Sequence, residues 1–292
     1  AAYMDYHLDF STYIDSNVRS CALLYETIVQ NKLPVEKIII ASSQSVYGEG
    51  KYRCTTHGVF YAKTRSEKQF KDHAWDIRCP QCKTIADIIP ATETDELHPH
   101  IPYAVSKVAS ENISFTLGKT YRIPTVALRY SIVQGARQSL QHFYSGALRD
   151  FSVRALSNMS IRMQEDAQQL RDFVNVHDVV DAHLYVLKNK RADYEAFNVG
   201  SNKKTKVCKL AQLVARVAQK TYTPELPGEF RINSPRHSLL NSRKLMRLGW
   251  KPTRTLENSV TEYINWVQTQ PDALTAWKKT YISMHRQGIL KT

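Results

Sequence analysis

Short apolar runs alternate along this chain with longer stretches in which apolar residues recur at helical spacing. Residues 37–41 and 123–133 are apolar runs of the kind expected for strands buried on both faces of a parallel sheet. Residues 196–200 are a further short strand closed by a glycine. Helical patterns are expected around Asn17–Ile28, 103–117, the end of 170–187, 207–219, 256–268 and after Pro271. Arg149 and Arg154 are expected to flank a further helix-like stretch. Strands that alternate with helices predict an α/β protein with a doubly wound parallel sheet, a Rossmann-like fold.

A polar insert, residues 51–98, interrupts this alternation. It carries two pairs of metal-ligand residues, Cys54 with His57 and Cys79 with Cys82, separated by 21 residues. Paired knuckles of this spacing fit a tetrahedral structural zinc site. Four protein ligands leave no open coordination position, so the metal would stabilise the insert without doing chemistry. The alternative is that these are four unrelated loop residues.

Composition and charge narrow the class of protein. The 292 residues are 42% hydrophobic and 23% charged, as in ordinary globular enzymes. The net charge of +13 is spread along the chain without an arginine-rich tract, which favours a basic surface around an anionic-ligand site over a nucleic-acid-binding protein. No apolar run is long enough for a membrane span, and no secretory signal is seen. Five cysteines, an odd number, suggest a reducing compartment, so we expect a cytoplasmic protein that binds neither nucleic acid nor membrane.

Candidate chemistry lies at the start of one predicted helix. Tyr103 and Lys107 are four residues apart and share a helix face. A cation held near a phenol lowers its pKa, which makes the tyrosine a usable general acid or base near neutral pH. Alone, this spacing is weak evidence for catalysis, since a tyrosine and a lysine four residues apart are more often part of a solvated helix face. Ser43 ends the first buried strand, at the sheet edge where open α/β proteins bind ligands, although a plain strand exit would look the same.

Several motifs occur in register along the chain up to about residue 268. They are Asn17-Val18, ASSQSVYGE, PYAVSK, LRY followed by a glycine turn and Arg137, RDFVNVHDVVDAH, FNVG and LGWKP. Together they resemble the extended short-chain dehydrogenase/reductase family of nucleotide-sugar epimerases and dehydratases. The insert and the segment LRYSIVQGARQS resemble, more narrowly, the subgroup of bacterial dTDP-L-rhamnose 4-epimerases.

This resemblance implies an NAD-dependent 4-epimerase acting on a nucleotide-diphosphate sugar. NAD would take a hydride from C4, leave a 4-keto sugar and return the hydride to the other face. Tyr103 would be the acid/base at the sugar 4-hydroxyl and Ser43 would assist the proton transfer. Lys107 would bind the nicotinamide ribose and lower the pKa of Tyr103. The implied cofactor-binding residues are Asn17, Ser43, Tyr103, Lys107 and Ser131, and the implied substrate-binding residues are Ser43, Tyr103, Arg171 and Arg231.

The resemblance also predicts a division of the chain. Residues 1–135 would be a partial NAD-binding Rossmann domain that contains the insert. Residues 136–292 would be mainly a smaller substrate-binding lobe, with 170–189 and 196–200 returning to the main domain. A homodimer through the helix bearing Tyr103 and its neighbour is expected by analogy alone.

Departures from the family pattern refine these expectations. Dehydratases of the family carry an acidic pair where this chain has Gln44 and Ser45, which argues for an epimerase over a 4,6-dehydratase. Ile132 replaces an asparagine common in the family, which changes a contact near the sugar or the diphosphate. Ala167 replaces a glycine, which is tolerable if the backbone there has negative φ.

One family motif is absent from the sequence. No G-x-x-G-x-x-G stands in these 292 residues, although the dinucleotide fold uses that turn to approach the pyrophosphate. We therefore expect the N-terminal part of the nucleotide-binding sheet to be missing, in a fragment or a degenerate paralogue. Such a chain would bind NAD poorly and expose an apolar sheet edge.

Other functions stay open. A UDP-glucose or other UDP-hexose 4-epimerase, or a keto-sugar reductase, could use the same residues. A non-catalytic binding protein that retains the fold is the alternative from another class, and the serine, tyrosine and lysine set argues against it.

Overall fold

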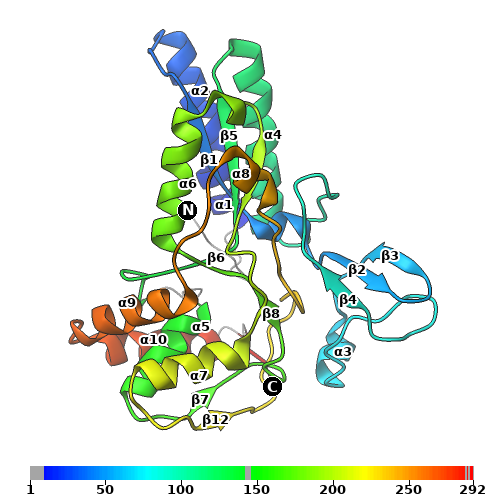
Figure 1. Ribbon diagram of the computed structural model, residues 1–292, viewed down its shortest axis with the longest axis vertical. Coiled ribbons are helices and arrows are strands. Elements are labelled where there is room, and N and C mark those ends of the chain that lie inside the picture. Colours follow the sequence, from blue (N-terminus) through cyan, green and yellow to red (C-terminus); the bar gives the residue numbers. More distant parts are fainter. Residues whose placement is uncertain (1–9, 142–145, 287, 289, 292) are drawn as a thin grey trace.

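Three parallel strands in the order β1-β5-β10 form the centre of the larger body of the computed structural model (Figure 1). The structure describes residues 10–141, 146–286, 288, 290 and 291. β5 (Thr125–Tyr130) lies between β1 (Ile38–Ser43) and β10 (Ala196–Val199), and its first five residues are buried. The predicted α/β architecture with a parallel sheet is confirmed.

Helices cover both faces of this sheet. α2 (Ser20–Gln30) and α4 (Pro102–Tyr121) pack on one face, and α6 (Val176–Lys188) packs on the other. The side chains of β5 alternate accordingly: Ala127 belongs to the cluster under α2 and α4, whereas its two neighbours belong to the cluster under α6. This alternation is the period-two pattern of a strand placed between two helical layers.

The other elements are short or belong to the periphery. The remaining helices are α1 (Phe10–Tyr13), η1 (Ile14–Arg19, π-helical), η2 (Gln44–Tyr47), α3 (Glu67–Lys71), α5 (Gly146–Leu156), η3 (Lys190–Ala192), α7 (Val207–Val217), α8 (Arg243–Leu248), α9 (Leu256–Gln268) and α10 (Ala273–Arg286). The remaining strands are β2 (Lys51–Cys54), β3 (Gly58–Tyr61), β4 (Asp87–Ile89), β6 (Ile132–Gln134), β7 (Ile161–Arg162), β8 (Leu170–Arg171), β9 (Phe173–Asn175), β11 (Thr205–Lys206) and β12 (Pro224–Glu225).

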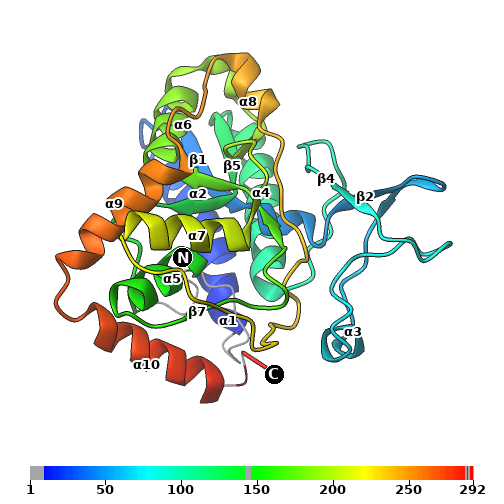
Figure 2. The same ribbon diagram turned by 60° about the horizontal axis from the view of Figure 1, so that its bottom comes forward.

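A second lobe lies at the end of the sheet where β1 and β5 finish (Figure 1). Helices α5, α7, α9 and α10 build it; Figure 1 shows them below the sheet, and Figure 2 brings this lobe forward. Their apolar faces form the largest buried cluster, to which Phe151, Leu210, Tyr263 and Trp277 contribute. This lobe therefore has a core of its own, separate from the two clusters that flank the sheet.

The insert projects from the side of the molecule (Figures 1 and 2). Its antiparallel sheet has the order β3-β2-β4, over a small core around Tyr52, Ile77 and Ala86. Phe70 of α3 stacks on Phe230 of the second lobe, with ring centroids 5.2 Å apart. The insert thus folds as a small unit that contacts the second lobe as well as the sheet.

The structure corrects four expectations. β1 is not buried on both faces: Ala41 is exposed, because among the described residues β1 pairs only with β5. The strand expected over 123–133 breaks at Ser131, after which β6 pairs with β9 in a separate two-stranded sheet. Arg149 lies inside α5, not beside it. The backbone of Ala167 has φ +58°, so the replacement of glycine falls at a left-handed position where alanine is disfavoured by about 1 kcal/mol.

No helix among the described residues combines the length and the apolarity that crossing a bilayer would need.

Candidate functional site

The residues expected to do the chemistry meet where β1 ends and α4 begins. α4 opens with Pro102, whose fixed φ suits the first turn of a helix, so Tyr103 lies in that turn and Lys107 one turn further on. The Lys107 Nζ donates to the carbonyl of Ala41, at 2.8 Å, and to Asn17 Oδ1, at 3.2 Å. The same Nζ lies 5.6 Å from the centroid of the Tyr103 ring. The helix, the strand and the preceding helical segment therefore fix the ammonium group beside the phenol.

The protonation of Tyr103 differs from the sequence expectation. Burial raises the pKa of Tyr103 above its ordinary value, and a hydrogen bond with the Ser43 side chain partly opposes this rise. Burial also lowers the pKa of Lys107. The expected lowering of the tyrosine pKa by the lysine is thus not seen in this structure, because burial is the largest influence on the pKa of each group and disfavours the charged form of both.

Asn17 is held in a π-helical turn, η1, directly before α2. Its amide nitrogen donates to Ser106 Oγ at 2.9 Å while its amide oxygen accepts from Lys107. Tyr13, on the turn before, packs edge-on against Tyr103 with ring centroids 6.2 Å apart. Single π-helical turns are frequent at functional sites because they turn side chains out of the α-helical register. Here the turn aims an asparagine at the lysine.

Ser131, the remaining residue of the expected cofactor site, directly follows β5. It is buried, its amide donates to the carbonyl of Val199, and its hydroxyl oxygen has no hydrogen-bond partner among the described residues. The same is true of the buried amide oxygen of Gln44, one residue after Ser43. A buried polar atom without a partner costs free energy, so each of these atoms is a candidate contact for a ligand.

A buried ion pair lies next to this site and connects α4 with the sheet, and the sequence analysis did not predict it. Glu111 accepts from the Arg129 guanidinium at 2.7 and 3.0 Å and from the hydroxyl of Ser42. Arg129 also donates to the Tyr47 hydroxyl at 2.9 Å. Glu111 follows Lys107 by four residues, so the two charged side chains share a helix face, and this spacing was the available signal. The pair ties α4 to the central strand directly beneath the serine turn.

The two arginines expected to bind phosphate occupy the edge of the second lobe. The Arg171 guanidinium donates to the carbonyls of Leu170, Pro235 and Arg236 at 2.8 to 3.0 Å, and burial lowers its pKa to about 10. Arg231 lies in the loop between β12 and α8. The structure thus places Arg171 against the chain segment that follows Arg231.

The four cysteine and histidine residues of the insert come together. Their ligand atoms all lie within 4.8 Å of one another. The Cys54 Sγ lies 3.6 Å from the Cys82 Sγ, and His57 Nδ1 lies 3.6 Å from the Cys79 Sγ. Main-chain N–H groups, that of His57 foremost, lower the pKa of Cys54 to about 5, which favours the metal-binding thiolate. The predicted grouping of these residues is confirmed.

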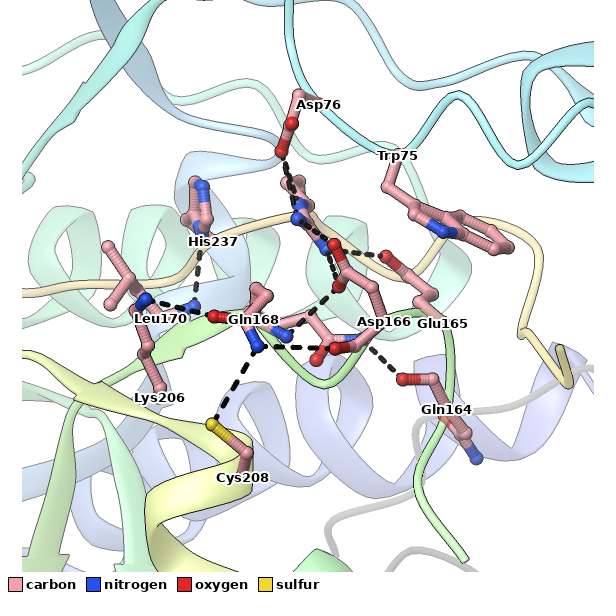
Figure 3. A network of polar contacts seen from close by, with 12 residues as sticks. Trp75, Asp76, Gln164, Glu165, Asp166, Gln168, Leu170, Lys206, Cys208 and His237 are labelled. Carbon is pink, nitrogen blue, oxygen red and sulfur yellow. Dashed lines mark hydrogen bonds and ion pairs between the residues drawn. The ribbon is translucent and has the colours of Figure 1, made fainter. Parts of the chain in front are cut away.

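A second polar cluster, which sequence reasoning did not find, joins the insert to the second lobe (Figure 3). Arg65 forms a two-pronged ion pair with Glu165, both contacts at 2.9 Å, and both side chains are buried. The Arg236 guanidinium is surrounded by Asp76, Glu165 and Asp166. The partners are 70 to 160 residues apart in sequence, so no local pattern could have revealed them.

Comparisons with known proteins agree with this fold. Residues 80–200 match the NAD dependent epimerase/dehydratase family. The chain is 30% identical, over 257 residues, to dTDP-L-rhamnose 4-epimerase of Burkholderia thailandensis; the match covers 88% of this chain and 69% of that protein. It is 31% identical over 185 residues to a putative UDP-glucose 4-epimerase of Methanocaldococcus jannaschii, with 62% and 57% of the two chains covered.

Solved structures show the same fold. The UDP-glucose 4-epimerase of Thermotoga maritima with UDP-glucose superposes with a TM-score of 0.69 at 24% identity, over 89% of this chain and 72% of that one. The UDP-glucose 4-epimerase of Thermus thermophilus in complex with NAD gives a TM-score of 0.65 at 24% identity, over 88% and 71%. The fold is that of the Rossmann-like short-chain dehydrogenase/reductases. This chain belongs to the NAD-dependent epimerase/dehydratase family.

Proposed function

We propose that this protein is an NAD-dependent nucleotide-sugar 4-epimerase of the dTDP-L-rhamnose 4-epimerase kind. The observation that carries the proposal is the meeting of Ser43, Tyr103 and Lys107 at the carboxyl end of β1. A purely structural role does not require a serine hydroxyl, a buried phenol and a buried ammonium group at one point. The similarity to a dTDP-L-rhamnose 4-epimerase over 88% of the chain supports the same conclusion.

In this proposal each residue of the group has one role. Tyr103 holds and returns the proton of the sugar 4-hydroxyl, and its hydrogen bond with Ser43 gives that proton a path between two oxygens. Lys107, fixed by Ala41 and Asn17, orients the nicotinamide ribose and keeps a positive charge near the phenol. When bound, NAD supplies the hydride acceptor and donor at C4. Because burial alone raises the pKa of Tyr103, the proposal requires the bound state to favour the phenolate more than this structure does.

The residues fit the nicotinamide end of NAD. Lys107 and Asn17 present an ammonium group and an amide beside Tyr103, and Ser131 offers a buried hydroxyl oxygen that lacks a partner in the described part of the chain. The pyrophosphate end has no such counterpart, since the sequence contains no glycine-rich G-x-x-G-x-x-G turn. The cofactor proposal therefore rests on the reactive end of the site.

A nucleotide-diphosphate sugar is the proposed substrate, with Arg171 and Arg231 at its diphosphate. Guanidinium groups suit this role because they stay charged and bind phosphate oxygens in pairs. Gln44 and Ser45 carry no acidic proton, which favours epimerisation over the elimination of water by a 4,6-dehydratase. A UDP-hexose 4-epimerase and a keto-sugar reductase are second candidates because they would use the same acid/base group.

We also propose that Cys54, His57, Cys79 and Cys82 bind one structural zinc ion. Two turns bring three sulfur atoms and one imidazole nitrogen within 4.8 Å, which suits a closed tetrahedral site. Measuring the zinc content of the purified protein tests this: one zinc per chain supports the assignment, and a chain that folds without metal contradicts it.

We propose a homodimer through α2 and α4, because these helices carry the exposed apolar side chains Leu23, Leu24 and Val105.

The decisive experiment is an epimerase assay with Tyr103→Phe. The unaltered protein, supplied with an excess of NAD that offsets the weak cofactor binding expected without the glycine-rich turn, is expected to convert dTDP-L-rhamnose or UDP-glucose to its C4 epimer. The variant keeps the ring and its packing but lacks the hydroxyl, so turnover should fall by at least a factor of about 100. Folding is checked by circular dichroism. Equal turnover in the two proteins would reject the assignment, and saturable nucleotide-sugar binding without turnover would favour a non-catalytic binding protein.

A further inference from the structure

Four successive carbonyl groups in one segment of the second lobe accept hydrogen bonds from side chains elsewhere in the protein. The segment, Asn233–Arg236, begins two residues after Arg231. His100 Nε2 lies 3.0 Å from the carbonyl oxygen of Asn233; since a carbonyl only accepts, the histidine donates. Arg65 Nη2 donates to Ser234 at 2.7 Å, and Arg171 donates to Pro235 at 2.9 Å and to Arg236 at 2.8 Å. Side-chain hydrogen bonds to four consecutive carbonyl groups thus hold this segment in place, although it belongs to no helix or strand.

The donors come from three distant parts of the chain. Arg65 belongs to the insert, Arg171 ends β8 of the second lobe, and His100 lies three residues before Tyr103. The segment is therefore fixed at the point where the insert, the second lobe and the catalytic helix approach one another.

Arg65 is the strongest of these connections. Its side chain is 1% exposed, and its two terminal nitrogens also contact Glu165, whose side chain is 3% exposed, at 2.9 Å each. A second bond joins Nη1 to the carbonyl of Trp75 at 3.1 Å. One guanidinium group thus links the insert, the loop before β8 and the 233–236 segment, and a planar five-donor group is the side chain suited to three partners at once.

The far end of the segment is fixed in the same way. The Arg236 amide donates to Glu49 at 2.6 Å, and its guanidinium binds Asp166 through two contacts of 2.6 and 2.7 Å. Asp76, which Figure 3 shows approaching from the insert, accepts from Arg236 Nε at 2.9 Å. The insert therefore contacts both ends of the segment, through Arg65 and through Asp76.

We propose that Arg65 is a positioning residue for substrate binding: through Ser234 and Glu165 the insert holds the 233–236 segment, and so Arg231, in place for the diphosphate of the substrate. This inference rests on the proposed function, because it takes a nucleotide diphosphate as the ligand. It gives the insert a role in the reaction, although the insert contributes no group to the chemistry.

Arg65 can affect Arg231 because it limits the conformations open to the turn that contains Arg231 and Ser234. The Ser234 amide donates back to the Arg231 carbonyl at 3.3 Å, so the two residues form one turn. Loss of Arg65 leaves the Ser234 carbonyl without this donor and Glu165 with one arginine in place of two. The turn can then adopt several conformations, and a ligand that needs one of them binds more weakly in proportion to its remaining population.

The test compares ligands that differ by one phosphate. Affinities for UDP and UMP, and for dTDP and dTMP, are measured by titration calorimetry on the full chain and on Arg65→Gln. The matched control is Arg154→Gln. Arg154 is also a buried arginine, paired with Asp150 at 3.0 Å, and its described contacts do not include residues 233–236.

We expect Arg65→Gln to weaken UDP or dTDP binding at least tenfold while the monophosphate affinities change less than threefold. Arg154→Gln should lower thermal stability without altering the ratio of diphosphate to monophosphate affinity. An unchanged ratio in Arg65→Gln would overturn the inference and leave the proposed function standing. If the unaltered protein binds none of the four nucleotides, both fail together. Equal losses for di- and monophosphates would show a general structural role and also overturn it.

Discussion

Removing the carboxylate of Glu111 should destabilise the protein more than any exposed charge change can. Glu111 and Arg129 have side chains 3% and 7% exposed, and the guanidinium meets the carboxylate at 2.7 and 3.0 Å. Burial alone would lower the pKa of Arg129, but the Glu111 carboxylate more than reverses that effect and raises it. Arg129 therefore stays charged inside the protein because Glu111 compensates it.

In Glu111→Gln the positive charge stays buried without its counter-charge, and an amide nitrogen faces a donor. Breaking a buried pair in this way costs about 3 to 5 kcal/mol. The Ser42 hydroxyl, which also donates to Glu111, loses a charged acceptor, so a value near the upper end is expected. The ratio of folded to unfolded protein at a given urea concentration should fall by a factor of about 100 or more.

The assay is urea unfolding at pH 7, followed by both circular dichroism and tryptophan fluorescence so that coincident transitions establish a single step. The control is Glu257→Gln, which breaks the exposed pair with Arg216, at 3.1 Å with side chains 54% and 65% exposed. That change should cost less than about 1 kcal/mol. If Glu111→Gln lowers the free energy of unfolding no more than this control does, and the dependence on urea concentration is the same, the buried pair does not hold α4 to the sheet.

Two further predictions concern Asp172, the residue after Arg171. A Cβ on Gly200 would lie 2.2 Å from the Asp172 Oδ2, so Gly200→Ala should cost about 2 kcal/mol or more in urea unfolding; a stability equal to the unaltered protein would contradict the close contact. Burial raises the pKa of Asp172 from its ordinary 3.8 to about 6. A carboxyl group whose pKa is raised in the folded state stabilises the fold at low pH, and that contribution is lost as the pH rises from about 4 to 6. The free energy of unfolding of Asp172→Asn should therefore rise by about 3 kcal/mol relative to that of the unaltered protein between pH 4 and pH 7. Parallel stability curves for the two proteins would show that Asp172 titrates normally.

The sequence determined the elements and the chemistry that local spacing can encode. The apolar run that becomes β5 is buried along the strand, and the helix predicted over 256–268 has those bounds in the structure. Tyr103 and Lys107 share a helix face because four residues are close to one turn. The two knuckles predicted the cysteine and histidine cluster because each pair is formed within a single tight turn.

Only the tertiary structure decided what depends on residues far apart in the chain. The pKa of Tyr103 rises, contrary to the local expectation, because burial depends on everything packed around the phenol. The positive φ of Ala167 cannot be read from a residue that normally avoids it. The ion pairs of Arg129, Arg65 and Arg236 join partners 18 to 160 residues apart, and no periodicity records such contacts. Spacing fixes which side chains share a face, whereas the desolvation of those side chains and their distant partners are set by the packing of the whole chain.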